Sequence, residues 1–541
     1  MTSSRGHSKR FQIPFARSLI YQKSFFPDSI RLWISLPDEL PNVTSVSLFK
    51  QEVQSILLHF RQSQMCVTGQ TMNAQEVGLQ FYCVHTYFYC PLLLIAFIFR
   101  TDDLFASFEN KYKKKPLFLA RASGRVNLIG EHIDYCGYSV LPMAIEQDIL
   151  MAVATNTNTE LHLSNANSKF SDFVTDMTSF TIDQSRPEWH NYILCGIKGI
   201  LERAGMVDTP QGMSIMVDGN VPKSAGLSSS SALVCCAGLA TMHAHSLAFT
   251  KTELADICMR CEHYIGTQGG GMDQSICFLA KAGTAKHIEF NPIRAHDVSL
   301  PEGVVFVVAN SCVELQKAST SHFNIRVVEC RLASQILAKS KGLEWRKMRR
   351  LADVEKALGV SLSDMEEMVD QVLHPEPYTK DEVCGILSLS TDELNSESLS
   401  QNTLHVQSFK LHNRAMHVFS EANRVLKFKA LCNDSSVKDP AQLLGNLMND
   451  SHASCRDLYE CSCPELDELV EICKKAGALG SRLTGAGWAG CTVSMVPNDT
   501  LQAFLKQVED EFYAKDPNRR SKVTESLFAT QPGQGAVIYQ I

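Results

Sequence analysis

Arg121-Ala-Ser-Gly-Arg125-Val-Asn-Leu-Ile-Gly-Glu131-His132-Ile-Asp134-Tyr135 gathers five cationic, acidic or imidazole side chains directly before an apolar run, Val140–Ile145. Charged groups beside such a run are costly unless they are exposed, paired or functional. Carboxylates and an imidazole together can take several hydroxyls in hydrogen bonds, which is how a polyol is oriented. A surface turn that carries salt bridges is the alternative. The segment therefore predicts either a polyol site or an ion-paired turn.

A second segment, Gly226-Leu-Ser-Ser-Ser-Ser231-Ala232, has the composition of a phosphate cradle. It lies between an alternating stretch at 213–217, which predicts a strand, and an apolar stretch at 232–242, which predicts a buried helix. Glycine permits a tight turn, and the start of a helix presents free N–H groups to an anion. A serine linker or an ordinary serine N-cap is the alternative. The chain has neither a P-loop lysine motif nor the paired protein-kinase motifs, so any nucleotide site is of a third type.

Two further segments are rich in glycine. Residues 266–274 present Asp273 after a flexible turn with three consecutive glycines, and residues 484–491, the third glycine segment, precede a strand-like stretch at 492–495. Each alone is typical of a loop between packed elements. Three such segments in one chain favour a ligand site that is built from loops.

Composition excludes some classes of function. The 541 residues carry 51 basic and 58 acidic side chains, a formal charge of −7, so no global field attracts nucleic acid or anionic lipid. The 19 cysteines are scattered through apolar stretches, which favours reduced, buried thiols and a cytoplasmic location. The densest group, Cys455, Cys461, Cys463 and Cys473, lacks the paired spacing of a structural zinc site. We expect no nucleic-acid partner, no membrane association and a monomer.

Residues 1–100 differ from the rest of the chain and lack sustained periodicity. They end in a largely apolar run, Phe81–Phe99, whose interruptions at His85, Thr86 and Pro91 leave it short of the ~20 residues that a membrane span needs. We treat 1–100 as an atypical N-terminal extension, for which disorder, a membrane anchor and mis-joined sequence are the alternatives. A chain that starts near residue 101 is expected to stay active. The expected domains are 101–310, with the charged segment and the serine loop, and 311–541, with a helical insertion from about 326 to 475.

Residues 124–135 resemble the galactokinase signature. Together with Pro222-x-x-x-Gly226-Leu-Ser-Ser-Ser230 and the loop at 485–491, they supply the three motifs of the GHMP kinases in the right order. Residues 136–139, 228–231 and 310–314 resemble the N-acetylgalactosamine kinase branch more than ordinary galactokinases. The resemblance implies a two-domain α/β (α+β) GHMP kinase fold. Its N-terminal domain would be like the second domain of ribosomal protein S5, its C-terminal domain ferredoxin-like, and the site would lie in the cleft between them.

The resemblance also implies a set of site residues. Asp273 falls on the catalytic aspartate and Arg125 on its partner arginine, and both also belong to the sugar-binding set with Glu131, His132 and Asp134. The phosphate loop would comprise Gly226, Ser228, Ser229, Ser230 and Ser231, with Ser230 as a ligand of Mg²⁺. Trp189 and Tyr192 match aromatic residues near adenine.

The implied reaction is phosphorylation of the anomeric hydroxyl of N-acetylgalactosamine, of galactose or of both, with ATP as donor and Mg²⁺ as cofactor. Phosphoryl transfer depends mainly on positioning and on charge stabilisation. Asp273 would accept or orient the proton of the hydroxyl, while Arg125 would keep the carboxylate ionised. The products would be the sugar 1-phosphate and ADP.

Four positions depart from the family pattern: Ser123 for proline, Gln268 for glutamate, Ala489 for glycine, and Phe323 for a sugar-contacting tyrosine. Ala489 would matter if the loop needs a positive φ there. Phenylalanine at position 323 favours N-acetylgalactosamine over galactose as the substrate. A non-catalytic protein that binds galactose and ATP and contacts a regulator is the alternative function, against which Asp273 and Arg125 both argue. A mevalonate or homoserine kinase is a second alternative, against which the polyol cluster argues.

Overall fold

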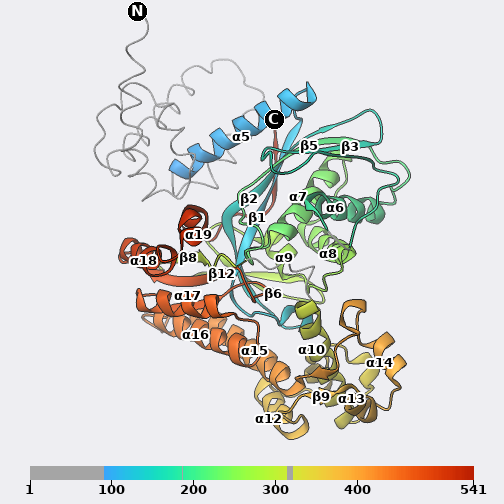
Figure 1. Cartoon of the computed structure of the whole chain (residues 1–541), viewed down its shortest axis with the longest axis vertical. Coiled ribbons are helices and arrows are strands. Elements are labelled where there is room, and N and C mark those ends of the chain that lie inside the picture. The colour runs from blue at the N-terminus through green and yellow to red at the C-terminus, as the bar shows by residue number, and fades with distance from the viewer. Residues whose placement is uncertain (1–90, 185–186, 314–320) are drawn as a thin grey trace, which may run out of the picture.

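The computed structural model describes residues 91–184, 187–313 and 321–541 (Figure 1). Residues 1–90 of the expected extension, including the apolar positions 81–90, lie outside the described residues, as does Glu314. Helix α5 (Pro91–Tyr112) spans the boundary expected at 100/101, which therefore falls inside a helix. Within the described ranges, no helix is both long and apolar enough to cross a membrane.

The first sheet has six strands in the order β14-β1-β2-β5-β3-β4, and only the β3–β5 pair is parallel. Residues 213–217, expected to be a strand, lie in β5. The last strand of the chain, β14, returns to this sheet beside β1. The strands are β1 (Phe118–Ile129), β2 (Leu141–Thr155), β3 (Glu160–Asn165), β4 (Phe173–Asp176), β5 (Met213–Gly219) and β14 (Val537–Gln540).

Helices cover both faces of the first sheet (Figure 1). Side chains alternate between the two faces of a strand. On β2, Met151 and Val153 join the main core, whereas Leu150 and Ala152 pack in a separate cluster with Phe97, Leu104 and Phe108 of α5. The main core contains α6 (Trp189–Ala204), α7 (Ser229–Ala244), α8 (Lys251–Glu262) and α9 (Met272–Leu279).

The second sheet is antiparallel, with the order β11-β12-β8-β13. Helices α17 (Pro464–Lys475) and α18 (Leu501–Val508) pack on it through Leu469, Ile472 and Phe504. Strand β8 pairs with β12 and β13, so the domain boundary expected at 310/311 falls after the first strand of this sheet. The strands are β8 (Val304–Asn310), β11 (Gly480–Leu483), β12 (Cys491–Pro497) and β13 (Leu527–Thr530).

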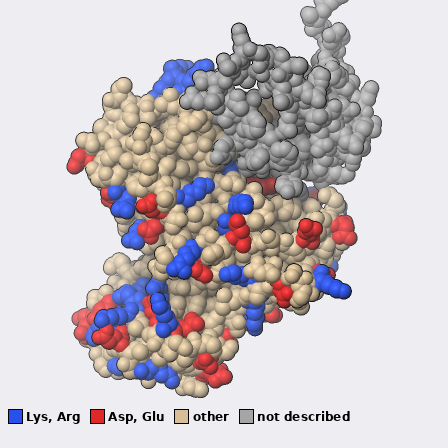
Figure 2. Space-filling model, turned by 180° about the vertical axis from the view of Figure 1, so that it is seen from behind, with Lys and Arg blue, Asp and Glu red and all other residues tan. Residues whose placement is uncertain are grey.

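The helical stretch expected from about 326 to 475 is present. It comprises α10 (Ser321–Ser340), α11 (Leu351–Leu358), α12 (Leu362–Val372), α13 (Lys380–Leu387), α14 (Thr391–Glu397), α15 (Leu411–Asn433), α16 (Ala441–Asp457) and α17. The remaining strands and α-helices of the described residues are short: β6 (Ala285–Glu289), β7 (Arg294–Val298), β9 (Tyr378–Thr379), β10 (Ser408–Phe409), α19 (Pro517–Ser521) and α20 (Val523–Ser526). On the face drawn in Figure 2, basic and acidic side chains are interleaved, as the near balance of charges predicts.

Candidate active site

The charged segment forms the end of β1 and the turn that follows it. Glu131 and His132 are buried, although both lie outside regular structure. The His132 backbone has φ +62°, a conformation that a non-glycine residue adopts only when its surroundings hold it there. Its ring nitrogens lie 2.8 Å from the Tyr135 hydroxyl and 2.9 Å from the Ala486 carbonyl oxygen. The turn is thus held by the third glycine segment, more than 350 residues away in the chain.

Asp273 and Arg125 form an ion pair at the heart of the site. Arg125 lies on β1, and Asp273 is the second residue of α9, directly after the glycine turn. Both Nε and Nη2 of Arg125 contact Oδ1 of Asp273, at 2.9 and 2.8 Å. The first turn of a helix favours a negative charge by about 0.3–1 kcal/mol. Arg125 and the helix start therefore both favour an ionised Asp273.

The glycines before α9 allow residues 266–274 to contact the charged segment at 121–135. A Cβ on Gly270 would lie 2.6 Å from Cγ of Asp134, which is too close for any side chain. The backbone N–H of Met272 donates to Oδ2 of Asp134 at 3.3 Å. Asp134 is therefore fixed beside the start of α9, next to Asp273.

The serine loop turns into the start of α7 as expected. Ser228 is the N-cap residue, with φ +60°, and its buried hydroxyl has no hydrogen-bond partner in the protein. A buried hydroxyl without a partner is costly unless a ligand satisfies it. Gly226 contacts the third glycine segment, because a Cβ there would lie 2.6 Å from the Thr484 carbonyl oxygen. The arrangement suits a bound anion such as a phosphate.

Ala489 is compatible with the third glycine segment. The positive φ values of this loop fall on Gly485, Gly487, Trp488 and Gly490, and not on Ala489. The alanine is buried and faces the same pocket as the serine loop. Its methyl group therefore does not strain the backbone.

Two adjoining pockets meet at the ion pair. The first spans about 520 Å³ and the second about 1640 Å³, in both cases counting space that is open to solvent, so the second is the more extensive of the two. Arg125, Asp273 and Ala486 line both. Of the expected residues, Glu131, His132 and Asp134 line the first pocket, whereas Trp189, Tyr192, Gly226, Ser228, Ser229 and Ser230 line the second.

Glu262 is a further charged residue of the site, and sequence reasoning missed it. It ends α8 and lines the first pocket. The Ser231 hydroxyl donates to its Oε2 at 2.7 Å, and the Ser230 hydroxyl lies 3.4 Å from its Oε1. Nothing in the sequence around Glu262 distinguishes it from other helical glutamates. Its proximity to the serine loop arises only when α7 and α8 pack together.

Ser230 and Glu262 fit a magnesium ion. Mg²⁺ prefers oxygen ligands and commonly takes only one or two from the protein, the others coming from water and substrate phosphates. A hydroxyl and a carboxylate that lie 3.4 Å apart beside an anion-binding helix start match this pattern. Ser231, in contrast, lies behind the loop and bonds both Glu262 and Asp273, at 2.7 and 3.4 Å.

The carboxyl group of Glu131 has an unusually high pKa. Burial raises its pKa to about 7, against the opposing effects of Arg482 and Arg125. The nearer of these, Arg482, has its Nη2 3.1 Å from Oε2 of Glu131. A carboxyl group that is poised near neutrality beside a pocket is characteristic of functional sites.

Two of the departures from the family pattern lie beside the first pocket. Phe323, on α10, lines this pocket, and its ring centre lies 5.5 Å from those of both His132 and Tyr135. Gln268 points to α10 instead, where its Oε1 accepts from Arg331 at 3.4 Å. Only Phe323 therefore presents its side chain to a ligand in the first pocket.

Models of three protein families match the chain. They are the galactokinase galactose-binding signature at residues 106–155, the GHMP kinases N terminal domain at 191–281 and the GHMP kinases C terminal at 429–515. These ranges contain the charged segment, the serine loop with Asp273, and the third glycine segment.

Curated relatives match along most of their length. A galactokinase of Dictyostelium discoideum is 42% identical over 484 residues, covering 81% of this chain and 96% of that protein. A galactokinase of Saccharomyces cerevisiae is 34% identical over 502 residues, covering 82% and 95%. A crystal structure of Lactococcus lactis galactokinase complexed with galactose has a TM-score of 0.63 at 24% identity, covering 81% and 99%. The expected two-domain GHMP kinase fold is thereby confirmed.

Proposed function

The chain belongs to the galactokinase family of ATP-dependent sugar kinases, and we propose that it phosphorylates the anomeric hydroxyl of galactose, of N-acetylgalactosamine or of both. The observation that carries the proposal is the Arg125–Asp273 ion pair at the junction of the two pockets. A group that must act on both the acceptor and the transferred phosphoryl has to stand between their sites. The sugar would occupy the first pocket and ATP the second.

In this reaction Asp273 accepts the proton of the anomeric hydroxyl, whose oxygen bonds to the γ-phosphorus. The bond from the γ-phosphorus to the β–γ bridging oxygen breaks, and ADP leaves. Arg125 holds the Asp273 carboxylate in place and offsets negative charge near the moving phosphoryl group. Mg²⁺ would supply charge neutralisation of the phosphates, with Ser230 and Glu262 as its ligands from the protein.

The sugar would be oriented by the Glu131 and Asp134 carboxyl groups, which can bond several of its hydroxyls. His132 also lines the pocket, and its ring nitrogens, which contact Tyr135 and Ala486, hold the turn that carries these groups. The serine loop, with the unpartnered Ser228 hydroxyl, supports binding of the phosphates. Trp189 and Tyr192 offer aromatic surface for adenine in the second pocket.

Phe323 supports acceptance of the N-acetyl sugar. Its side chain is an apolar wall of the first pocket, against which an acetamide methyl group can pack. A tyrosine at this position would add a hydroxyl, which favours contact with a sugar hydroxyl instead. We therefore include N-acetylgalactosamine beside galactose as a substrate.

A coupled ADP-release assay with each sugar titrated separately, with and without a magnesium chelator, tests the proposal. Sugar-dependent ADP release that stops with the chelator is expected, and the two kcat/KM values name the preferred sugar. ³¹P NMR should identify the product as a 1-phosphate. Sugar binding without turnover would instead indicate a non-catalytic sugar-binding protein, and faster turnover of mevalonate than of either hexose would overturn the choice of substrate.

A further inference from the structure

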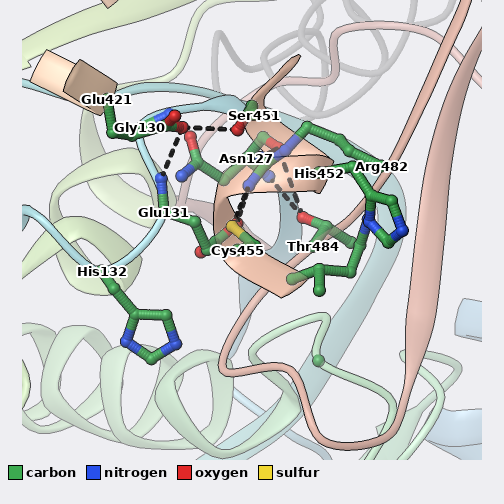
Figure 3. Close-up of polar contacts among 12 residues, drawn as sticks. Asn127, Gly130, Glu131, His132, Glu421, Ser451, His452, Cys455, Arg482 and Thr484 are labelled. Carbon is green, nitrogen blue, oxygen red and sulfur yellow. Dashed lines mark hydrogen bonds and ion pairs between the residues drawn. The ribbon is translucent and has the colours of Figure 1, made fainter. Parts of the chain in front are cut away.

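A buried polar network joins the turn after β1 to the C-terminal half of the chain (Figure 3). Glu421 on α15 and Arg482 on β11 are fully buried, and neither lines the first or the second pocket. The mechanism above does not use them. Two charges taken out of water this completely are expensive, so the contacts they make in return require an explanation.

Glu421 holds the backbone of the turn. Its Oε1 accepts from the N–H of Gly130 at 2.8 Å, from the N–H of Glu131 at 3.3 Å and from the Ser451 hydroxyl at 2.6 Å. Burial alone would raise the pKa of Glu421, but Arg424, Arg482 and His417 lower it to about 2. The carboxylate is therefore ionised, which makes it a strong acceptor for both peptide groups.

Arg482 holds the side chain of Glu131 and the strand before it. Its Nη1 donates to the Asn127 carbonyl oxygen at 2.7 Å, and its Nη2 lies 3.1 Å from Oε2 of Glu131. Thr484, two residues on, accepts from the Asn127 N–H at 2.9 Å. In Figure 3, Glu421 and Arg482 approach the turn from different elements, while the His132 ring points away from the network.

The position of Glu131 is therefore set by side chains that come from another domain. The carbonyl oxygen of Glu131 lies 3.1 Å from Nε2 of His417, which is also on α15. The backbone at Gly130 is packed closely against α15, since a Cβ there would lie 2.9 Å from Cγ2 of Val425. The Glu131 side chain, which contacts Arg482 and lines the first pocket, links this network to the pocket.

We propose that Arg482 and Glu421 are positioning residues, which hold the Glu131 carboxylate in the first pocket for contact with the sugar. The proposal rests on the proposed function, because it assumes that the first pocket binds the sugar. It deepens that function by making sugar affinity depend on the docking of α15 and β11 against the turn. The nucleotide side should be unaffected, because no residue of the second pocket contacts either side chain in the hydrogen bonds above.

Several titratable or charged groups lie around Glu131, and of these Arg482 and Arg125 lower its pKa. The groups are Arg125 on β1, His132 and Asp134 beside it, His417, Glu421 and Arg424 on α15, Cys455 on α16, Cys461 after it, and Arg482 on β11. Among these, Arg482 is the cation that contacts the Glu131 carboxylate directly. Its removal should favour the protonated form of Glu131.

The test compares wild type with Arg482→Gln, Arg482→Lys and Glu421→Gln, using separate titrations of sugar and ATP. Both loss-of-charge variants should raise the sugar KM by about tenfold to a hundredfold, the range for a displaced substrate-holding group, with little change in the KM for ATP. Arg482→Lys should recover part of the sugar affinity. The acidic limb of kcat/KM for the sugar should move to higher pH in Arg482→Gln, which a purely structural role would not produce.

Arg121→Gln is the matched control, since Arg121 is as buried as Arg482 and also lies on a strand, but it pairs with Asp148 instead of Glu131. It should lower stability and leave both the sugar KM and the acidic limb in place. If Arg482→Gln fails to fold, Ser451→Ala removes one hydrogen bond from Glu421 and should raise the sugar KM more mildly. An unchanged sugar KM and pH profile in folded variants would overturn the proposal. Absence of sugar turnover in wild type would instead overturn the proposed function.

Discussion

Strand β1 carries two buried arginines, Arg121 and Arg125, each paired with an aspartate, but the two pairs differ in access. Arg121 pairs with Asp148, which also pairs with Arg100 of α5, and the Arg121 and Asp148 side chains are 1% and 2% exposed. Four residues later, Arg125 pairs with Asp273, whose side chain is 13% exposed and lines both pockets. We call Arg121–Asp148 the closed pair and Arg125–Asp273 the open pair. The closed pair ties α5 to the sheet, whereas the open pair leaves a carboxylate available to a ligand in the pockets.

The same contrast separates Asp148 from Glu131. Burial alone would raise the pKa of Asp148, but Arg100 and Arg121, each 2.5 Å away, lower it below its usual value. Glu131 has one guanidinium in contact, at 3.1 Å, and burial raises its pKa to about 7. At Asp148 two guanidinium groups in direct contact outweigh the effect of burial, whereas at Glu131 the contact with Arg482 and the influence of Arg125 do not.

The largest effect on stability should come from breaking the closed pair. Asp148→Asn leaves the buried charge of Arg121 without its aspartate partner, so the free energy of unfolding should fall by about 3–5 kcal/mol. Urea unfolding measures the loss, and kcat of the folded fraction should be unchanged. Asp297→Asn is the control: its side chain is 42% exposed in its pair with Lys286, and it should cost less than about 1 kcal/mol. Equal losses in both variants would contradict the contrast.

Substitution in the open pair should lower kcat instead of stability. Arg125→Lys keeps the charge but cannot contact Asp273 through two nitrogens and Gly226 through a third, so kcat should fall by about a hundredfold. Steady-state kinetics measures this. The matched change on the same strand, Arg121→Lys, should reduce stability and leave kcat near the wild-type value. A similar loss of kcat in both variants would show that the two pairs do not differ in role.

Helix α5 should contribute to stability, through its contacts with the sheet and the closed pair, and not to turnover. Chains that begin at residue 91 or at residue 101 differ by the first ten residues of α5, including Phe97, which is buried, and Arg100. The shorter chain should be less stable by about 1.5–3 kcal/mol from the lost burial of Phe97. Both chains should share the same kcat, because neither residue lines a pocket. Identical melting temperatures for the two chains would refute the part assigned to α5.

The last effect concerns pH. Glu131 binds a proton more tightly in the folded protein, at about 7, than in the unfolded chain, near the ordinary value of 4.5. Its contribution to stability is therefore full below about pH 4.5 and is lost as pH rises through 7, by up to about 1.4 kcal/mol per pH unit. Urea unfolding from pH 5.5 to 7.5 should show wild type losing stability relative to Glu131→Gln.

Asp148 should give no such trend in this range. Its lowered pKa means that its contribution is present above its ordinary value of 3.8 and is lost only as pH falls toward the folded-state value. The difference between wild type and Asp148→Asn should therefore stay constant from pH 5.5 to 7.5. If wild type and Glu131→Gln instead gave parallel curves, the raised pKa of Glu131 would be contradicted.

The sequence predicted the local features well because they depend on neighbours along the chain. The alternation at 213–217, the apolar stretch at 232–242 and the three glycine segments all lie where the strand, helix and site loops are. Asp273 could be singled out as a carboxylate just after a glycine-rich turn, but its catalytic role was predicted only from the resemblance to the family. These predictions rest on the periodic spacing of apolar side chains and on the conformational freedom of glycine, and both can be read from a single sequence.

Contacts that tertiary packing creates could not be predicted in this way. Glu262, Glu421 and Arg482 are single charged residues, without a local pattern, and they reach the site only through the packing of α7, α8, α15 and β11. The membership of β8 in the second sheet was hidden for the same reason. A buried strand presents the same apolar run whichever sheet it joins.

The kcat of Asp273→Asn, measured by coupled ADP release at saturating sugar and ATP, is the most direct test that the open pair performs the chemistry. The substitution preserves the shape of the side chain and removes the proton acceptor. A loss of about 10²–10⁴-fold in kcat is expected, with the sugar still bound and the protein still folded. A variant that turns over at the wild-type rate would contradict the central role of Asp273.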